Sequence, residues 1–250
     1  MATLQEKTVV ITGAGRSIGQ RLALGFAEQG AHVLVHYGHA SKGAEEVVNQ
    51  IRAQGRRAEL VQADLQKADD VARLAQEAHN KLGAIDIWIN NAGASANSSE
   101  TRGMTDIEIF ERMVGVDIFG TWRCCTEAVP YMRDGSCIIT TGWDGALSGY
   151  PTFPDQMYAI SKGAIMSLTR CLAQQLAPRI RVNCIAPGRI ENEWVQTLSE
   201  RAKQKAADDI PMKRWGTPDD ILGTALFLAS PAASFITGQV LLVNGGGVMR

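Results

Sequence analysis

The chain has 250 residues, of which 45% are hydrophobic and 20% are charged, and its formal net charge is −1. This length and composition allow a sizeable core, and we expect one globular domain spanning residues 1–250. The near-zero charge argues against nucleic acid or an anionic membrane surface as a partner. No apolar run approaches the ~18 residues of a membrane span and no leader is recognisable, so we expect a cytoplasmic protein. The five cysteines form no C-x-x-C pair and lie in apolar surroundings, which indicates reduced, buried thiols and no metal site.

Short β-branched runs alternate with longer amphipathic segments, beginning with a run over residues 8–11 and a helical pattern over 18–29. Further strands are expected at residues 31–35, 58–62, 85–89, 137–140, 180–183 and 239–243. Further helices are expected at residues 41–54, 67–82, 105–132, 157–177 and 217–229. This alternation predicts a parallel sheet covered on both faces, in a single three-layer α/β domain that is doubly wound in the Rossmann manner. Irregular stretches at 94–103, 145–156 and 188–209 each follow a strand, where the ligand crevice of such a sheet lies.

A glycine-rich turn lies between the first expected strand and the first expected helix. Its sequence, TGAGRSIG over residues 12–19, lets the backbone turn tightly and lets a pyrophosphate approach the amides of a helix N-terminus. A glycine cluster in a loop is usually only a turn, but this position favours dinucleotide binding. The predicted cofactor contacts here are Gly13, Gly15, Arg16, Ser17, Ile18 and Gly19.

The end of the second expected strand bears on the choice of dinucleotide. A site selective for NAD normally has an acidic residue here, which accepts a hydrogen bond from the ribose 2′-hydroxyl. This strand ends without a carboxylate. The residues that could instead neutralise or hydrogen-bond a 2′-phosphate are Arg16, His39, Ser41 and Lys42. We therefore expect NADP(H) as the cofactor, with NAD(H) less favoured. Tyr37, at the end of the strand, is included among the predicted cofactor contacts. Alternatively, the polar side chains here are merely solvated at the surface of a loop and a helix start.

Tyr158 and Lys162 stand four residues apart at the head of an expected helix. Positions i and i+4 share one helical face, so the phenol and the ammonium can converge on one point. A fixed cation stabilises the phenolate and lowers the tyrosine pKa from its usual ~10, which would tune the phenol for proton transfer to a carbonyl oxygen.

Six short motifs occur in order: Thr12-Gly13 to Gly19, Ala63-Asp64-Leu65, Asn90-Asn91-Ala92-Gly93, Tyr158 to Lys162, Asn183 to Pro187-Gly188, and Thr237-Gly238-Gln239 to Asn244-Gly245-Gly246. Together they resemble the short-chain dehydrogenase/reductase family over nearly the whole chain. The chain is most similar to the 3-oxoacyl-carrier-protein reductase type, through His36-Tyr37, residues 44–48 and Ile185–Gly188. The resemblance implies an NADP(H)-dependent oxidoreductase that interconverts a ketone and a secondary alcohol.

The resemblance also implies roles for individual residues. Asp64 would accept a hydrogen bond from the adenine amino group beside the Leu65 backbone, and the Asn90–Gly93 segment would pass close to the adenosine ribose. Lys162 would bind the nicotinamide ribose and keep Tyr158 acidic, and Tyr158 would donate the proton as hydride reaches the carbonyl carbon. The residues lining the nicotinamide would be Pro187, Gly188 and Ile190.

Two departures from the family concern glycine and serine. Ser17 replaces a family glycine, which we expect to cost little because its hydroxyl can cap the helix or face a phosphate. Gly142 stands where the family has the serine that holds the substrate oxygen. Thr141 is our preferred replacement donor, ahead of Ser148 and the Trp143 indole. Alternatively, Thr141 simply completes a strand.

A third departure is Asp117, which replaces the asparagine that the family uses in the water relay behind the lysine. Its charge would favour a protonated Lys162 if the two groups are close. Alternatively, Asp117 makes only local hydrogen bonds. Two further hypotheses therefore stay open beside the reductase: a protein that binds NADP(H) with little catalysis, and an enzyme that uses the same phenol in non-reductive acid/base chemistry.

Residues 189–212 resemble the family's mobile substrate lid, and their polar start suggests a small-molecule carbonyl or alcohol substrate with polar groups. The family commonly forms homotetramers through helices beside the sheet. The apolar content of residues 105–132 and 157–177 agrees with this, so we expect a homo-oligomer, either a tetramer or a dimer.

Overall fold

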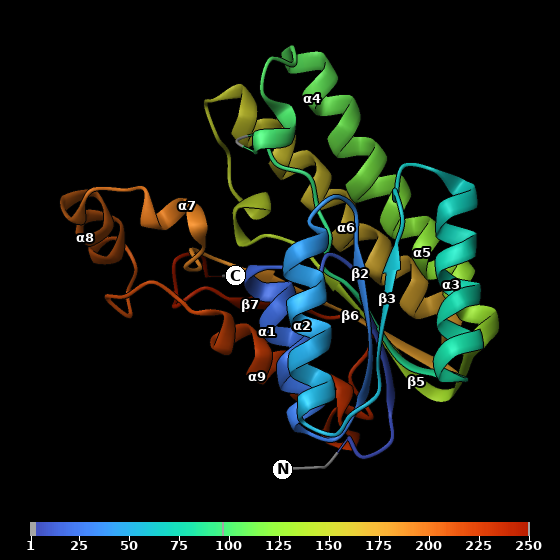
Figure 1. Cartoon of the computed structure of the whole chain (residues 1–250). Coiled ribbons are helices and arrows are strands. Elements are labelled where there is room, and N and C mark those ends of the chain that lie inside the picture. The colour runs from blue at the N-terminus through green and yellow to red at the C-terminus, as the bar shows by residue number, and fades with distance from the viewer. Residues whose placement is uncertain (1–3, 97, 250) are drawn as a thin grey trace.

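The computed structural model describes residues 4–96 and 98–249. Seven described strands form one parallel sheet in the order β3-β2-β1-β4-β5-β6-β7 (Figure 1). They are β1 (Thr8–Ile11), β2 (His32–Tyr37), β3 (Ala58–Gln62), β4 (Ile85–Asn90), β5 (Met132–Thr141), β6 (Ile180–Pro187) and β7 (Val240–Val243). The order reverses between β1 and β4, which places the ligand crevice at their carboxyl ends.

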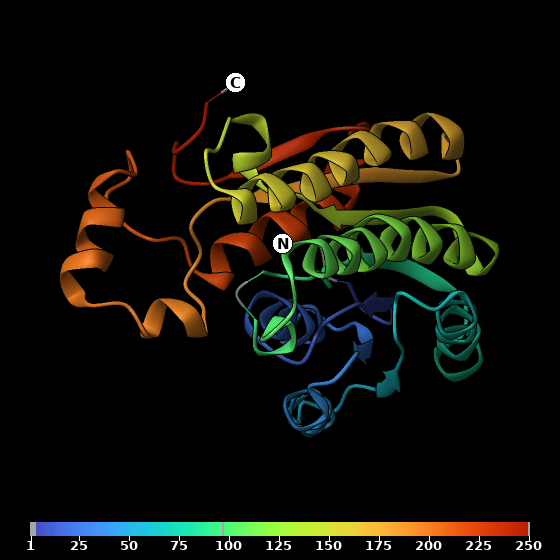
Figure 2. The ribbon, with the colours of Figure 1, turned by 90° about the horizontal axis from the view of Figure 1, so that it is seen from above.

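Helices cover both faces of the sheet (Figure 2). One face carries α1 (Ser17–Glu28), α2 (Ser41–Ala53) and α9 (Pro218–Ala229), and the other carries α3 (Ala68–Leu82), α5 (Thr121–Ala128) and α6 (Phe153–Leu176). Side chains alternate across the sheet, so Val9 and Ile11 of β1 enter one core while Val10 enters the other. The predicted doubly wound, three-layer α/β fold is confirmed.

The helical segment predicted over residues 105–132 is present, but it contains a π-helical stretch that was not predicted, and its last residue belongs to β5. The segment forms α4 (Asp106–Met113), a π-helical stretch η2 (Val114–Gly120), then α5 and a 3-10 turn η3 (Val129–Tyr131). Three other 3-10 turns are η1 (Ser99–Thr101), η4 (Asp144–Leu147) and η5 (Pro231–Ala233). Single π turns inside helices are rare and occur frequently at functional sites, which draws attention to η2.

Several predicted boundaries also differ from the structure. β5 and β6 are longer than predicted. α6 begins at Phe153, so the stretch predicted as irregular over 145–156 ends one turn earlier, and the stretch over 188–209 contains α7 (Glu193–Gln196) and α8 (Glu200–Asp208). Four cysteines are buried as predicted, but Cys171 is exposed on α6.

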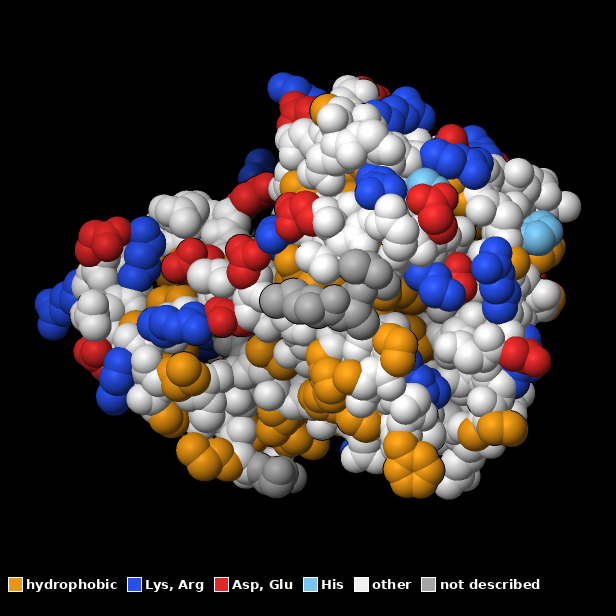
Figure 3. All heavy atoms as spheres, turned by 90° about the horizontal axis from the view of Figure 1, so that it is seen from below, with side chains coloured by type: hydrophobic (Ala, Val, Ile, Leu, Met, Phe, Trp, Pro, Cys, Tyr) orange, Lys and Arg blue, Asp and Glu red, His pale blue; other side chains and the backbone are white. Residues whose placement is uncertain are grey.

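α7 and α8 project from the sheet on the side where the carboxyl ends of the strands lie (Figures 1 and 2). Figure 3 shows hydrophobic side chains gathered on one face of the molecule. Apolar side chains are also exposed within the two segments expected to mediate self-association, at Phe119, Trp122 and Ile160. Self-association remains a prediction. Among the described residues, no helix combines the length and apolarity that a membrane crossing requires.

Candidate active site

Two adjoining cavities lie at the carboxyl ends of the strands. The first, of about 270 Å³, is bounded by the glycine-rich turn after β1, the end of β2 and the loops after β3 and β4. The second, of about 690 Å³, is bounded by the ends of β5 and β6, the start of α6 and the segment that carries α7 and α8. Ile18, Asn91, Gly93 and Ala94 line both cavities, so a long ligand could extend from one into the other.

The first cavity contains a turn that fits a phosphate group. A β-carbon at Gly19 would lie 2.2 Å from the carbonyl oxygen of Gly13, so only glycine lets α1 start so close to β1. No side chain caps α1 at Arg16, and its first turn has no acidic residue. Its first backbone N–H groups therefore face an anion without a competing carboxylate, as the pyrophosphate of a dinucleotide requires.

Ser17 adopts φ = 48°, in the left-handed region that favours glycine. A non-glycine residue in this conformation costs on the order of 1 kcal/mol, which counts against the small cost expected for serine. A contact between the Ser17 hydroxyl and a phosphate remains a prediction. The family glycine is thus explained by backbone conformation.

Most residues predicted to bind the cofactor line the first cavity: Gly13, Gly15, Arg16, Ser17, Ile18, Gly19, Tyr37, His39, Asp64, Leu65, Asn91, Ala92 and Gly93. Ser41 and Lys42 line neither cavity, because they begin α2 beyond the mouth. Asn90 also lies apart. Its buried amide accepts from Trp88 Nε1 at 3.0 Å and donates to Cys125 Sγ at 3.2 Å, so it stabilises the interior of β4.

His36 positions the glycine-rich turn, a role that the sequence analysis missed. Its Nδ1 accepts from the Gly13 N–H at 3.1 Å, and its Nε2 donates to the Ala63 carbonyl at 3.0 Å. The ring is therefore a neutral tautomer, and burial lowers its pKa to about 4. A polar residue within an otherwise apolar buried strand was the available signal.

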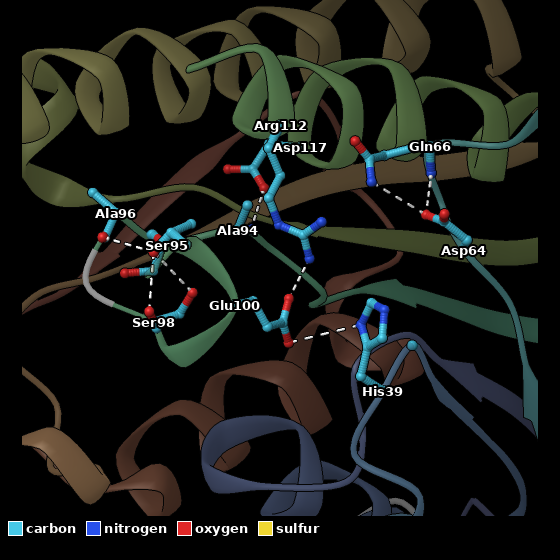
Figure 4. A network of polar contacts seen from close by, with 12 residues as sticks. His39, Asp64, Gln66, Ala94, Ser95, Ala96, Ser98, Glu100, Arg112 and Asp117 are labelled. Carbon is cyan, nitrogen blue, oxygen red and sulfur yellow. Dashed lines mark hydrogen bonds and ion pairs between the residues drawn. The ribbon is translucent and has the colours of Figure 1, made fainter. Parts of the chain in front are cut away.

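The loop after β4 is held against the same turn. The Thr12 hydroxyl accepts hydrogen bonds from the backbone N–H groups of Asn91 and Ala92, each at 3.0 Å. The Asn91 side chain donates to the carbonyls of Thr12 and Gly13 at 3.0 and 3.1 Å. These bonds fix the wall shared by the two cavities. On the wall of the first cavity, the Asp64 carboxylate is held by Gln66 (Figure 4).

Tyr158 and Lys162 lie on one face of α6 and line the second cavity. The Lys162 Nζ lies 5.3 Å from the centre of the Tyr158 ring and 3.2 Å from Oδ2 of Asp117. Asp117 also accepts from the Ala94 N–H at 2.8 Å (Figure 4) and from the Ser161 hydroxyl at 3.0 Å. Asp117 and Lys162 are both buried and in contact, so the condition set for their electrostatic interaction is met, and Asp117 does not make local hydrogen bonds alone.

Local backbone features bring this cluster together. Asp117 lies in the π-helical stretch η2, which interrupts the path from α4 to α5. A β-carbon at Gly93 would lie 2.8 Å from the Lys162 Nζ and 3.2 Å from Oδ1 of Asp117. Glycine therefore lets the loop after β4 pass directly over the ion pair.

Comparisons with known proteins agree with this geometry. Residues 13–247 match a family model described as Enoyl-(Acyl carrier protein) reductase. The 3-oxoacyl-[acyl-carrier-protein] reductase FabG of Staphylococcus epidermidis is 36% identical over 97% of this chain and 99% of that protein. The 3beta-hydroxysteroid dehydrogenase 1 of Eggerthella lenta is also 36% identical, over 97% of this chain and 94% of its own. The chain belongs to the short-chain dehydrogenase/reductase family.

Solved structures of the family superpose closely. A short-chain dehydrogenase/reductase from Brucella melitensis has a TM-score of 0.89 at 31% identity and covers 98% of both chains. A blue fluorescent protein from a metagenomic library, solved in complex with NADPH, has a TM-score of 0.90 at 30% identity, covering 99% of this chain and 100% of that one. The named relatives are reductases and dehydrogenases, so this short-chain dehydrogenase/reductase is an oxidoreductase by family.

In this short-chain dehydrogenase/reductase Lys162 lowers the pKa of the Tyr158 phenol as predicted, but burial has the larger effect. Burial raises the pKa of its phenol above the ordinary value; Lys162 lowers it, but Asp117 raises it again. Burial alone would lower the pKa of the Lys162 ammonium, but Asp117 and Tyr158 raise it above its ordinary value. Asp117 therefore keeps the lysine charged and weakens its effect on the phenol.

The serine position of the family is closed in this chain. A β-carbon at Gly142 would lie 2.9 Å from both the Cys184 Sγ and the Met166 Cγ. Neighbouring side chains thus occupy the volume that a serine would need. The sequence showed a missing donor, whereas the packing shows that its place has been filled.

Thr141, the predicted replacement donor, lines the second cavity. The preceding residue, Thr140, bonds to Thr169 of α6 at 2.7 Å. Because side chains alternate along β5, the Thr141 side chain leaves the sheet on the face opposite α6. A direct contact between Thr141 and a substrate oxygen beside Tyr158 remains a prediction.

Trp143 forms an aromatic wall beside the phenol. Its ring meets Tyr158 edge-on at 5.0 Å and stacks on Tyr150 at 5.0 Å. Trp143 lines the second cavity, and no hydrogen bond from its indole Nε1 is found within the described chain; Ser148 lines neither cavity. Geometry therefore favours the indole over Ser148 as a donor to a ligand.

The segment predicted as a lid forms part of the wall of the second cavity. Apolar residues of α7 and α8 and their junction line it, namely Val195, Leu198 and Ala202. Arg189 donates to the Ala206 carbonyl at 2.9 Å and pairs with Asp209 at 3.6 Å, which tethers α8. The mobility of this segment remains a prediction.

Proposed function

We propose that this chain is an NADP(H)-dependent oxidoreductase that reduces a ketone to a secondary alcohol, with Tyr158 as the proton donor. The observation that carries the proposal is the juxtaposition of Tyr158 and Lys162 in a cavity that joins the phosphate-binding turn of α1. The names of the relatives support it, since one denotes a 3-oxoacyl reductase and another a hydroxysteroid dehydrogenase.

The proposed cofactor fits the residues of the first cavity. The turn from Gly13 to Gly19 would hold the pyrophosphate, and Arg16 and His39 would meet a 2′-phosphate. Pro187 and Ile190, which line the second cavity, would flank the nicotinamide. When bound, the reduced nicotinamide supplies a hydride to the carbonyl carbon.

The protein would supply the proton and its placement. As the carbonyl oxygen gains negative charge, the Tyr158 O–H donates its proton to that oxygen and is left as a phenolate beside the Lys162 ammonium. The raised pKa keeps Tyr158 protonated at neutral pH, which suits reduction. Alcohol oxidation would instead need the phenolate, so it should require alkaline conditions.

The test compares wild-type protein with Tyr158→Phe over a panel of ketones, following NADPH oxidation and product mass. Tyr131→Phe is the matched control, because Tyr131 stacks on His79 away from both cavities. Loss of about 10² to 10⁴-fold in kcat for Tyr158→Phe alone is expected. Equal turnover by wild type and Tyr158→Phe overturns the mechanism.

A second candidate is a protein that binds NADP(H) with little catalysis. The closed serine position at Gly142 favours it, because the family's donor to the substrate oxygen is missing there. It predicts direct NADPH binding to wild-type protein without turnover of any ketone in the panel. A product of unchanged mass would indicate the non-reductive chemistry instead, because only net reduction adds two hydrogens.

A further inference from the structure

A carboxylate from a neighbouring loop lies across the mouth of the first cavity. Glu100, in the turn η1 after β4, forms an ion pair with Arg112 of α4, and its other oxygen lies 3.8 Å from Nδ1 of His39 (Figure 4). All three residues line that cavity. Glu100 therefore bridges two elements on opposite sides of the mouth, α4 and the loop between β2 and α2.

Arg112 has more hydrogen-bonding capacity than its surroundings use. Its side chain is only 17% exposed, and within the described chain Glu100 is the one polar group found paired with it. A guanidinium has five N–H donors in a planar fork, which matches a phosphate at least as well as a carboxylate. A largely buried cation with a single partner at a cavity wall is prepared for a second ligand.

The carboxylate marks where that ligand would lie. One Glu100 oxygen faces Arg112 and the other faces His39, so the space between the two basic side chains already holds an anion. His39 stands just past the end of β2, which is the place where this fold recognises the adenosine ribose. Arg16, on the adjoining turn, lines the same cavity.

We propose, relying on the dinucleotide site of the proposed function, that Arg112 is a specificity residue for the 2′-phosphate of NADP(H). In the absence of cofactor, the Glu100 carboxylate pairs with Arg112 and faces His39. When NADP(H) binds, its 2′-phosphate displaces the Glu100 carboxylate and interacts with Arg112 and His39 instead. A phosphomonoester carries a charge of about −1.5 to −2 at neutral pH, so it competes with a carboxylate. The uncharged 2′-hydroxyl of NAD(H) does not, and Glu100 stays in place.

Direct binding tests this without catalysis. Dissociation constants are measured by calorimetry for NADPH and NADH, and for adenosine 2′,5′-bisphosphate and adenosine 5′-monophosphate, which isolate the 2′-phosphate. Arg112→Gln should weaken NADPH and the bisphosphate by about tenfold or more and change NADH and the monophosphate little. Glu100→Gln should lower the dissociation constant for NADPH several-fold, because the competing negative charge is gone.

Arg112→Lys keeps the positive charge but lacks the planar guanidinium. Its dissociation constant for NADPH should lie between those of wild type and Arg112→Gln.

The matched controls are Arg102→Gln and Glu111→Gln, which remove the same charges from exposed positions outside the cavity. Equal weakening of both nucleotides by Arg112→Gln, or no weakening of either, overturns the role of Arg112. A Glu100→Gln protein that binds NADPH more weakly overturns the displacement. Wild-type protein that binds neither dinucleotide refutes the proposed function itself, and the inference falls with it.

Discussion

His36 should make the stability of this protein fall at mildly acidic pH. The ring is buried, accepts from Gly13 and donates to Ala63, and only a neutral ring can do both. Burial lowers its pKa from 6.5 to about 4. Protonation would leave a buried charge facing the Gly13 N–H, in the turn proposed to hold the pyrophosphate.

The size of the effect follows from the shift. Because the folded-state pKa lies below the unfolded value, the stabilisation is fully present above pH 6.5 and is lost as the pH falls through about 4. At about 1.36 kcal/mol per unit, a shift of roughly 2.5 units corresponds to about 3 kcal/mol. Between about pH 7.5 and about pH 4.5, roughly 2.5 kcal/mol of this should disappear.

The assay is urea unfolding of wild type and His36→Asn across that pH range. The variant keeps an acceptor near Gly13 but has no titrating ring. Carboxylates present in both proteins make the same pH-dependent contribution to both unfolding free energies, so this contribution cancels when one is subtracted from the other. The wild type should lose about 2.5 kcal/mol more than the variant on acidification. His39→Asn, which removes a ring that is 65% exposed, should follow the wild type. Parallel pH dependences for wild type and His36→Asn would refute the reasoning.

Two further predictions concern the departures from the family. Burial raises the pKa of Tyr158 most, and the charge of Asp117 adds to it; Asp117→Asn removes that charge, so the alkaline limb of kcat/KM for alcohol oxidation should move to lower pH. An unmoved profile would contradict this electrostatic coupling. Gly142→Ser should destabilise the fold by about 1 to 3 kcal/mol through overpacking against Cys184 and Met166, with no gain in kcat. Urea unfolding and steady-state kinetics check this, and a faster enzyme of unchanged stability would show that the position is open.

The sequence alone was sufficient for the framework of the site. β1 has the predicted bounds because a short, continuous apolar run ended by glycine is a local signal. The four-residue spacing of Tyr158 and Lys162 places them on one helical face whatever surrounds them. The glycine turn before α1 likewise depends on local backbone freedom, whereas the positive φ of Ser17 was seen only in the folded structure.

Tertiary structure decided the electrostatics and the available space. Asp117, in the π-helical stretch η2, lies beside Lys162, and burial together with the charge of Asp117 outweighs the lowering of the Tyr158 pKa by Lys162. Packing across β6 and α6 closed the place beside Gly142, and the turn from η1 into α4 brought Glu100 to Arg112. Propensity and spacing act over a few residues, whereas a pKa or a filled volume depends on every group packed nearby, including groups far away along the chain.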